Sequence, residues 1–266
     1  MSRFQDTEAN TSEHKSYAVA VQGSKATAFE RDYKEFNERP YGSTFVYGRR
    51  KIERIIEPVL LSFPPGARAV DVGCGTGFNL RRLHDRGFDV TGVEPSVELR
   101  SIAAADNPAV QILDGDIENL PLESGTFDLV LVIEVVRYLA DPSRALAELA
   151  RVLRPGGVAI VTVAPRWSLN GYAAVNQVTA RVKVPGFTQL RQSFMSERSG
   201  IRAMQAAGFS SVEVHGAFVG PWQILGRLAP ETLAPALRKW EPLDDTISDR
   251  PVLRDLSNHL VLIGRK

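Results

Sequence analysis

The chain has 266 residues, with 32 lysine and arginine residues, 31 aspartate and glutamate residues and a formal net charge of +1. Its 44% apolar and 24% charged residues are typical of a soluble globular protein with one or two domains. The near-zero net charge leaves no electrostatic footprint for a nucleic-acid backbone, so we expect no nucleic-acid partner.

The chain has one cysteine, which excludes an intramolecular disulfide and a cysteine-cluster zinc site. We expect no metal. No apolar run reaches the roughly 18 to 20 residues of a membrane span, and the first 16 residues contain no apolar signal segment. We therefore expect a cytoplasmic location and no membrane span.

The N-terminal residues 1–28 are polar and show no persistent period, and we interpret them as a mobile arm able to order over a bound ligand. The pattern becomes helical over residues 29–61, in two pieces that residues 39–42 separate. Apolar residues recur at helical spacing from Ile52 to Leu60.

Strand-like and helix-like segments then alternate, which predicts an α/β fold with a parallel sheet and crossover helices. The expected strands cover residues 67–72, 88–93, 110–113, 127–133 and 158–163, and the expected helices cover residues 78–86, 96–105 and 141–153. We expect Pro155, Gly156 and Gly157 to end the third of these helices. A further helix over 196–207 and strands over 209–218 and 258–263 complete one domain at residues 29–266.

Three segments of this domain are expected to be lids over a pocket, namely residues 29–50, 166–194 and 220–257. The last carries five of the 16 prolines, and we interpret it as a short helical insertion. Their side chains are largely aromatic and aliphatic, which favours a partly apolar substrate, with Arg49, Arg50 or Arg191 available for an anionic group. Alternatively, these side chains bury small cores of the insertions themselves.

The strongest local signal is the loop that follows the first strand, with glycines at Gly73, Gly75 and Gly77. Glycines at these positions allow a tight turn and a close approach of the backbone to a ligand. Phe78 stands where a dinucleotide-binding loop has its third glycine, so nicotinamide or flavin binding is disfavoured. The loop also lacks the lysine and hydroxyl residue of a phosphate-binding P-loop. A tight turn without a ligand is the alternative.

Two acidic residues follow the next strands. Glu94 comes after the second strand, about twenty residues beyond the loop, where a carboxylate can accept hydrogen bonds from both hydroxyls of a ribose. Asp116 follows the third strand, where it can accept a hydrogen bond from an adenine amino group while Ile117 provides apolar contact. Either acid alone is also a common helix cap or turn residue. Their joint position at neighbouring strand ends favours a nucleoside site.

The sequence resembles the class I S-adenosylmethionine-dependent methyltransferases, in particular the type 11 group of small-molecule methyltransferases. The resemblance covers roughly residues 52–208. It is carried by the glycine loop 70–77, Glu94, the turn 115–117, the strand 127–130 with residues 133–136 after it, and Leu153-Arg154-Pro155-Gly156-Gly157.

This resemblance implies a Rossmann-like sheet of seven mostly parallel strands with the last antiparallel. It also implies S-adenosylmethionine as cofactor, with Asp71 and Gly73 near its methionine part. Glu94 would bind the ribose, Asp116 and Ile117 the adenine, and the main chain at Ile133 would line the methionine end. The cofactor-binding set that we expect is Asp71, Gly73, Cys74, Gly75, Gly77, Glu94, Pro95, Asp116, Ile117 and Ile133.

The chain departs from many relatives after the fourth strand, where it has Arg137 and Tyr138 instead of Glu-His. No Asn/Asp-Pro-Pro-Tyr tetrad follows this strand, which argues against enzymes that methylate amino groups of adenine or glutamine. Glu134 and Tyr138 are the catalytic candidates, and we hypothesise that Glu134 is the polar group nearest the reaction centre. His215 and His259 are interpreted as structural residues of the last two strands, and His84 as solvated.

The function predicted from these residues is in-line methyl transfer from S-adenosylmethionine to a small, partly apolar metabolite. Two alternatives stay open. One is a protein that binds S-adenosylmethionine without catalysis, and the other, which the glycine spacing and Asp116 disfavour, is a nicotinamide-dependent reductase. The expected partner is the small-molecule acceptor.

Overall fold

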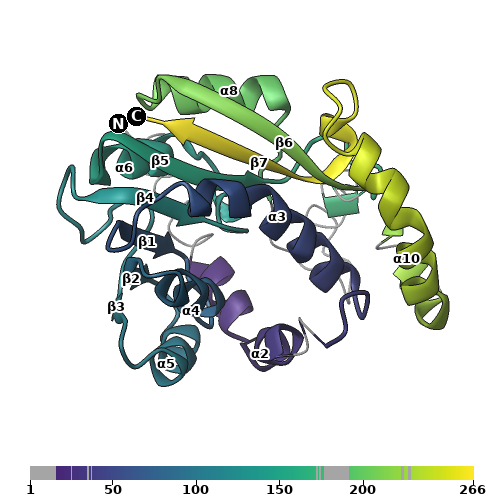
Figure 1. The fold of residues 1–266 in the computed structure, drawn as a ribbon, viewed down its shortest axis with the longest axis horizontal. Helices are drawn as coiled ribbons and strands as arrows, with labels where there is room; N and C mark the ends of the chain where they lie inside the picture. The colour runs from purple at the N-terminus through teal and green to yellow at the C-terminus, as the bar shows by residue number, and fades with distance from the viewer. Residues whose placement is uncertain are drawn as a thin grey trace, which may run out of the picture.

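The computed structural model describes residues 16–171, 192–222 and 229–266, apart from 25, 35 and 37, together with 173, 175, 176, 225 and 226. Figure 1 shows a twisted sheet whose order is β3-β2-β1-β4-β5-β7-β6. The strands are β1 (Arg68–Val72), β2 (Asp89–Val93), β3 (Gln111–Leu113), β4 (Phe127–Val132), β5 (Leu153–Val163), β6 (Ser211–Val219) and β7 (Ser257–Arg265). Neighbouring strands from β3 to β5 are parallel, and β7 is antiparallel to both β5 and β6. The predicted sheet of seven strands is therefore confirmed.

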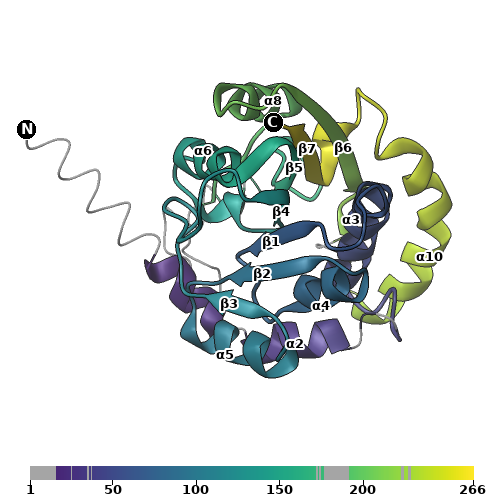
Figure 2. The same ribbon diagram turned by 60° about the vertical axis from the view of Figure 1, so that its left-hand side comes forward.

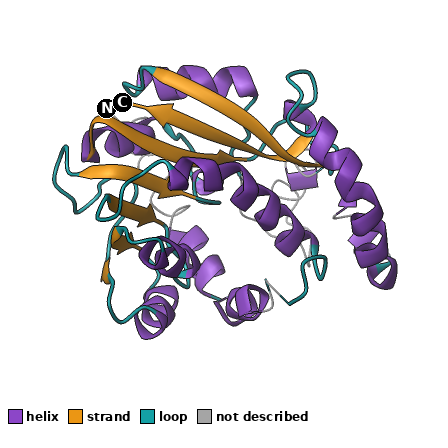
Figure 3. Cartoon of the chain, in the orientation of Figure 1, coloured by secondary structure: helices purple, strands orange, loops and turns teal. Residues whose placement is uncertain are grey.

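Helices cover both faces of the sheet, as Figures 2 and 3 show. They are α2 (Ala26–Lys34), α3 (Thr44–Leu61), α4 (Phe78–Asp85), α5 (Val97–Asp106), α6 (Ser143–Val152), α8 (Glu197–Ala206) and α10 (Pro230–Ile247), with short 3-10 helices η1 (Val136–Tyr138) and η2 (Arg254–Leu256). One core joins the sheet to α6 and α8, through side chains such as Leu149 and Met204. The other joins it to α3, α4 and α5, through Ile56, Leu80 and Ala103.

The strand β5 begins earlier than the sequence predicts. Pro155, Gly156 and Gly157 belong to β5 instead of ending the preceding helix. The Gly156 amide donates to the Lys266 carbonyl at 3.0 Å, and the Lys266 amide donates to the Gly157 carbonyl at 3.0 Å. These bonds come from a residue far along the chain. The local turn signals of Pro155, Gly156 and Gly157 therefore predicted a helix end where the structure has a strand.

The insertion at residues 220–257 contains a longer helix than the short helical insertion that we expected. Helix α10 has 18 residues and contains Pro235 and Pro242 in its interior. Its anchor is Asp244, a fully buried carboxylate that accepts hydrogen bonds from the Tyr47 hydroxyl at 2.9 Å and the Val219 amide at 2.8 Å. Tertiary contacts thus hold a helix that its prolines disfavour.

The N-terminal arm is helical over residues 16–23, and α2 begins at Ala26, where the sequence shows no persistent period. A side chain at Gly23 would meet Ser96 and Glu98 at 2.9 Å, so this segment packs against the loop between β2 and α5. Residues 1–15 and most of 172–191, part of an expected lid, lie outside the described residues. Within the described part, no helix combines the length and apolarity that crossing a bilayer requires.

Candidate active site

A cavity of about 1510 Å³ opens beyond the carboxyl ends of β1 to β4. This is the edge at which open α/β sheets bind ligands. Its floor is the loops after these strands, and residues 16–22, the first turns of α3, Phe218 and His259 complete its wall. The volume exceeds the roughly 300 to 1,000 Å³ of a typical small-molecule pocket, which leaves room for two ligands.

The glycine loop lies at this floor, and Gly73, Gly75 and Gly77 all have left-handed backbone conformations. A side chain at Gly73 would collide with Val135, and one at Gly77 with Asn107, so close packing requires both glycines. A side chain at Gly75 would meet no atom within 4 Å. Gly75 therefore leaves an open space at the loop.

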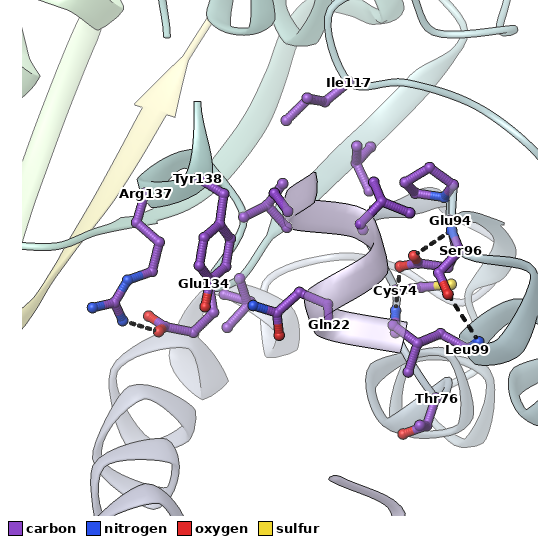
Figure 4. Close-up of a pocket in the computed structure, with 18 of the residues that line it drawn as sticks. Gln22, Cys74, Thr76, Glu94, Ser96, Leu99, Ile117, Glu134, Arg137 and Tyr138 are labelled. Atoms are coloured by element: carbon purple, nitrogen blue, oxygen red, sulfur yellow. Dashed lines mark hydrogen bonds and ion pairs between the residues drawn. The ribbon is translucent and has the colours of Figure 1, made fainter. Parts of the chain in front are cut away.

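Glu94 joins this loop to the start of α5. Its carboxylate accepts hydrogen bonds from the Gly75 amide and the Ser96 amide, both at 2.9 Å (Figure 4). The residue is only 5% exposed, and burial raises the pKa of its carboxyl group. The two amides fix the orientation of the carboxylate and leave its other lone pairs available to a ligand.

Asp71 and Arg49 are a buried pair of opposite charges beside the loop. Asp71 is 1% exposed, and neither carboxylate oxygen has a hydrogen-bond partner among the described residues. Burial raises its pKa to about 7, although the Arg49 guanidinium opposes the shift. Arg49 hydrogen-bonds Asn79 and pairs with Glu53 at 2.9 Å, while its Nε has no partner in the described part of the chain. These unused groups match the ammonium and carboxylate of an amino acid.

Asp116 and Ile117 lie in the cavity wall after β3. The Asp116 carboxylate accepts a hydrogen bond from the Glu118 amide at 3.0 Å, which shapes the turn. Ile117 is buried, and a side chain at Gly115 would crowd Val93 and Pro121. The turn is thus held by packing and by its own hydrogen bond.

Glu134 has a left-handed backbone with φ of 62°, and its amide donates to the Thr162 hydroxyl at 2.7 Å. Its carboxylate forms an ion pair with Arg137, and His259 Nδ1 lies 2.9 Å from Oε1. Burial acts to raise the pKa of Glu134, but its interactions with His259 and Arg137 outweigh burial and hold the pKa well below the usual range. Glu134 is therefore ionised and a weak base at neutral pH.

The cavity has two sides. In Figure 4, Glu134, Arg137 and Tyr138 lie on one side and Glu94, Ser96 and Cys74 on the other, with Gln22 between them. All the expected site residues line the cavity except Asp71 and Gly77, which lie behind its wall. Tyr138 ends η1, and the Arg137 guanidinium lies 6.0 Å from the centre of its ring.

Sequence reasoning missed part of this wall. His259 was interpreted as a structural residue of β7, yet it lines the cavity. Residues 16–22 and Phe218 were not singled out either, because their sequence neighbourhoods carry no motif. His215, in contrast, lies outside the cavity wall and pairs with Asp249 at 2.8 Å, as expected of a structural histidine.

Residues 70–161 match a protein family described as a methyltransferase domain. An uncharacterized methyltransferase of Mycobacterium tuberculosis is 41% identical over 106 residues, which are 36% of this chain and 43% of the relative. A malonyl-(acyl-carrier protein) O-methyltransferase of Serratia marcescens is 36% identical over 129 residues, which are 48% and 51% of the two chains. The chain spans about half the length of these curated relatives.

Among solved structures, a methyltransferase of Thermotoga maritima described as S-adenosylmethionine-dependent and a possible histamine N-methyltransferase has a TM-score of 0.61. The two sequences are 24% identical, and the match covers 93% of this chain and 99% of the other. This likeness shows that the fold is shared well beyond residues 70–161, the segment that the sequence family covers.

Proposed function

We propose that the chain is a class I S-adenosylmethionine-dependent methyltransferase that transfers a methyl group from S-adenosylmethionine to a small, partly apolar acceptor. The observation that carries the proposal is Glu94, a buried carboxylate held by the Gly75 and Ser96 amides at the edge of a large cavity. A carboxylate in this position is suited to the two hydroxyls of a ribose.

The residues present fit this cofactor. Glu94 would hold the ribose, and Asp116 and Ile117 would contact the adenine. Among the described residues, the Asp71 oxygens and the Arg49 Nε have no hydrogen-bond partner. Arg49 lines the cavity and would attract the carboxylate of the amino-acid end, while the negative charge of Asp71, buried beside the lining residue Val72, would attract its ammonium group. Gly75 leaves space for the ligand to approach the loop. The Asp71 oxygens, the Arg49 Nε and the open space at Gly75 are unfilled binding capacity among the described residues, which supports an amino-acid nucleoside as the ligand.

When bound, the cofactor supplies a methyl group activated by a positively charged sulfur. The protein then has to orient the acceptor and exclude water. Residues 16–22 and the first turns of α3 cover the cavity and would exclude water. Tyr138 and the main chain at Ile133 lie on the floor, where they would orient the reacting groups.

The wall of the cavity combines apolar and charged groups. Phe45, Leu139 and Phe218 are apolar members of this wall, and Glu134 with Arg137 forms a charged pair. The cavity is larger than a single ligand requires. Its size therefore supports an acceptor that binds beside the cofactor. A partly apolar metabolite with a polar reacting group fits such a wall.

Calorimetric titration with S-adenosylhomocysteine, the product form of the cofactor, tests this proposal. We expect saturable binding by the wild-type protein and no binding of NADH, whereas the reverse result would favour a nicotinamide-dependent reductase. Methyl transfer from radiolabelled S-adenosylmethionine to a panel of metabolites tests catalysis. Binding without transfer to any compound would favour the non-catalytic alternative.

A further inference from the structure

His259 belongs to β7 but takes part in the wall of the cavity. Leu260 pairs with Val163 at the end of β5, so the residue before it reaches the edge where the β4 loop lies. His259 Nδ1 comes to 2.9 Å from Glu134 Oε1. The antiparallel strand thus delivers a histidine to the Glu134 side of the cavity, beside a carboxylate.

Glu134 faces this ring. Its carboxylate is ionised, because its interactions with Arg137 and His259 hold its pKa low. Within the described part of the chain Nδ1 makes no hydrogen bond of regular geometry, but a lone pair on Nδ1 would face a carboxylate oxygen at 2.9 Å, so the proton of a neutral His259 belongs on Nδ1. Nε2 then carries the free lone pair of the imidazole, as in other histidines held by a carboxylate.

The position of α3 next to His259 Nε2 carries no side chain. Gly48 lies in the interior of α3, where glycine disfavours a helix. A side chain there would lie 3.5 Å from His259 Nε2 and 3.2 Å from Phe218 Cδ1. Glycine at this position therefore leaves Nε2 uncovered by α3.

Two residues with strained backbones lie next to the His259 ring. Within the described part of the chain, Glu134 and Phe218 are the residues other than glycine with a left-handed backbone, at φ of 62° and 69°. Phe218 lies in β6 beside Ala217, whose partner in β7 is His259. Strained residues of this kind are typical of functional sites, where the surrounding structure holds a required geometry.

From this geometry we propose that His259 is the general base of the reaction, that Glu134 positions it, and that the acceptor reacts through a hydroxyl group. The proposal rests on the methyltransferase function proposed above. The hydroxyl proton passes to Nε2 while an oxygen electron pair forms the bond to the methyl carbon, and the electrons of the broken carbon–sulfur bond remain on sulfur. The resulting imidazolium lies next to the Glu134 carboxylate, which stabilises it.

The test uses nitrogen-15 NMR of the four histidine rings at a pH where free imidazole is neutral. His215 is an internal control, because its Nδ1 also faces a carboxylate, that of Asp249, at 2.8 Å outside the cavity wall. We expect both rings to carry the proton on Nδ1. The His259 Nε2 resonance should differ between complexes with S-adenosylmethionine and S-adenosylhomocysteine, because only the first has a methyl group and a positive charge on its sulfur, while the His215 resonances stay unchanged.

Two variants sharpen the result. Glu134→Gln is expected to lose the single Nδ1-protonated form at His259 and leave His215 unaltered, which also reports that the variant is folded. Asp249→Asn is expected to do the opposite. A proton on Nε2 of wild-type His259, or identical His259 spectra in the two complexes, would overturn the assignment of the base alone. Absence of S-adenosylhomocysteine binding in calorimetry would instead defeat the proposed function together with it.

Discussion

The Gly75 amide donates a hydrogen bond to the Glu94 carboxylate at 2.9 Å, and this bond joins the loop after β1 to the loop after β2. The Glu94 carboxylate therefore connects two of the loops that form the cavity floor, and the bonds from the Gly75 and Ser96 amides fix its orientation. Because of the bond from Gly75, a movement of the glycine loop would also move Glu94, the residue proposed to bind the ribose.

Glu94→Ala is expected to weaken S-adenosylhomocysteine binding by about 10- to 100-fold, since hydrogen bonds to a charged group contribute about 1.5 to 3 kcal/mol. Calorimetry measures the change. Asp114→Ala is the matched control, because the Asp114 side chain is 72% exposed and forms a surface ion pair with Arg100 at 3.0 Å. Equal affinity of the Glu94 variant and the wild type would remove Glu94 from the binding site.

Gly75→Ala is expected to weaken S-adenosylhomocysteine binding at least about tenfold, because the added methyl group would occupy the open space at the loop. The left-handed backbone adds a strain of about 1 to 2 kcal/mol. Gly125→Ala imposes the same strain, at φ of 69° and with no atom within 4 Å, but lies outside the cavity wall. Denaturation should show similar stability losses for both variants, with binding lost only in the first. Normal affinity of Gly75→Ala would contradict the close approach of a ligand.

Asp71 is expected to make the stability of the unliganded protein depend on pH. Burial raises its pKa to about 7, from 3.8 for an ordinary aspartate. Between these values the folded protein binds a proton that the unfolded chain has lost, so the free energy of unfolding decreases as pH rises from about 4 to about 7. Asp71→Asn is expected to remove this decrease, as urea denaturation across that range would reveal.

The control for this pH series is Asp89→Asn, which alters a carboxylate that is 69% exposed. This variant should keep the wild-type dependence of the free energy of unfolding on pH. Binding provides a second measurement, because a ligand ammonium group is attracted to the ionised form of Asp71. Affinity for S-adenosylhomocysteine should increase from pH 6 to pH 8 in the wild type and stay level in Asp71→Asn. An unchanged stability profile in that variant would count against the assignment.

His259→Asn is expected to lower the turnover of any hydroxyl acceptor by about 10² to 10⁴, the usual contribution of a general base. Transfer to a thiolate, which has no proton to lose, should decrease much less. Gly48→Ala, which places a methyl group beside Nε2, is expected to reduce hydroxyl methylation while binding of S-adenosylhomocysteine persists. His215→Asn is the control for both. Equal losses for hydroxyl and thiolate acceptors would point to a structural role of His259.

Much of the sheet and its cavity floor could be predicted from sequence, because their signals are local. Ser96 caps α5, accepting a hydrogen bond from the Leu99 amide, and the buried strand β4 is apolar apart from Asp128. Gly73 and Gly77 have the left-handed backbones that their spacing predicts. Short stretches of chain contain all the chemistry that these elements need.

The remainder depends on partners distant in sequence. Asp244 stabilises α10 through Tyr47 and Val219, and neither contact shows in the proline-containing sequence of that helix. His259 becomes part of the cavity only because β7 inserts between β5 and β6. A strand register of this kind is decided by the assembled sheet, so the pairing with Glu134 could not be foreseen.

The cavity has a floor of strand ends and a cover of helices, and the two are built from different parts of the chain. Substitutions in residues 16–22 or in the first turns of α3 would reshape the space above the floor without moving Gly75 or Glu94. Methyl donor recognition and acceptor choice can therefore diverge separately in evolution, and libraries that vary the cover but keep Arg49 offer a route to new acceptors on an unchanged donor site.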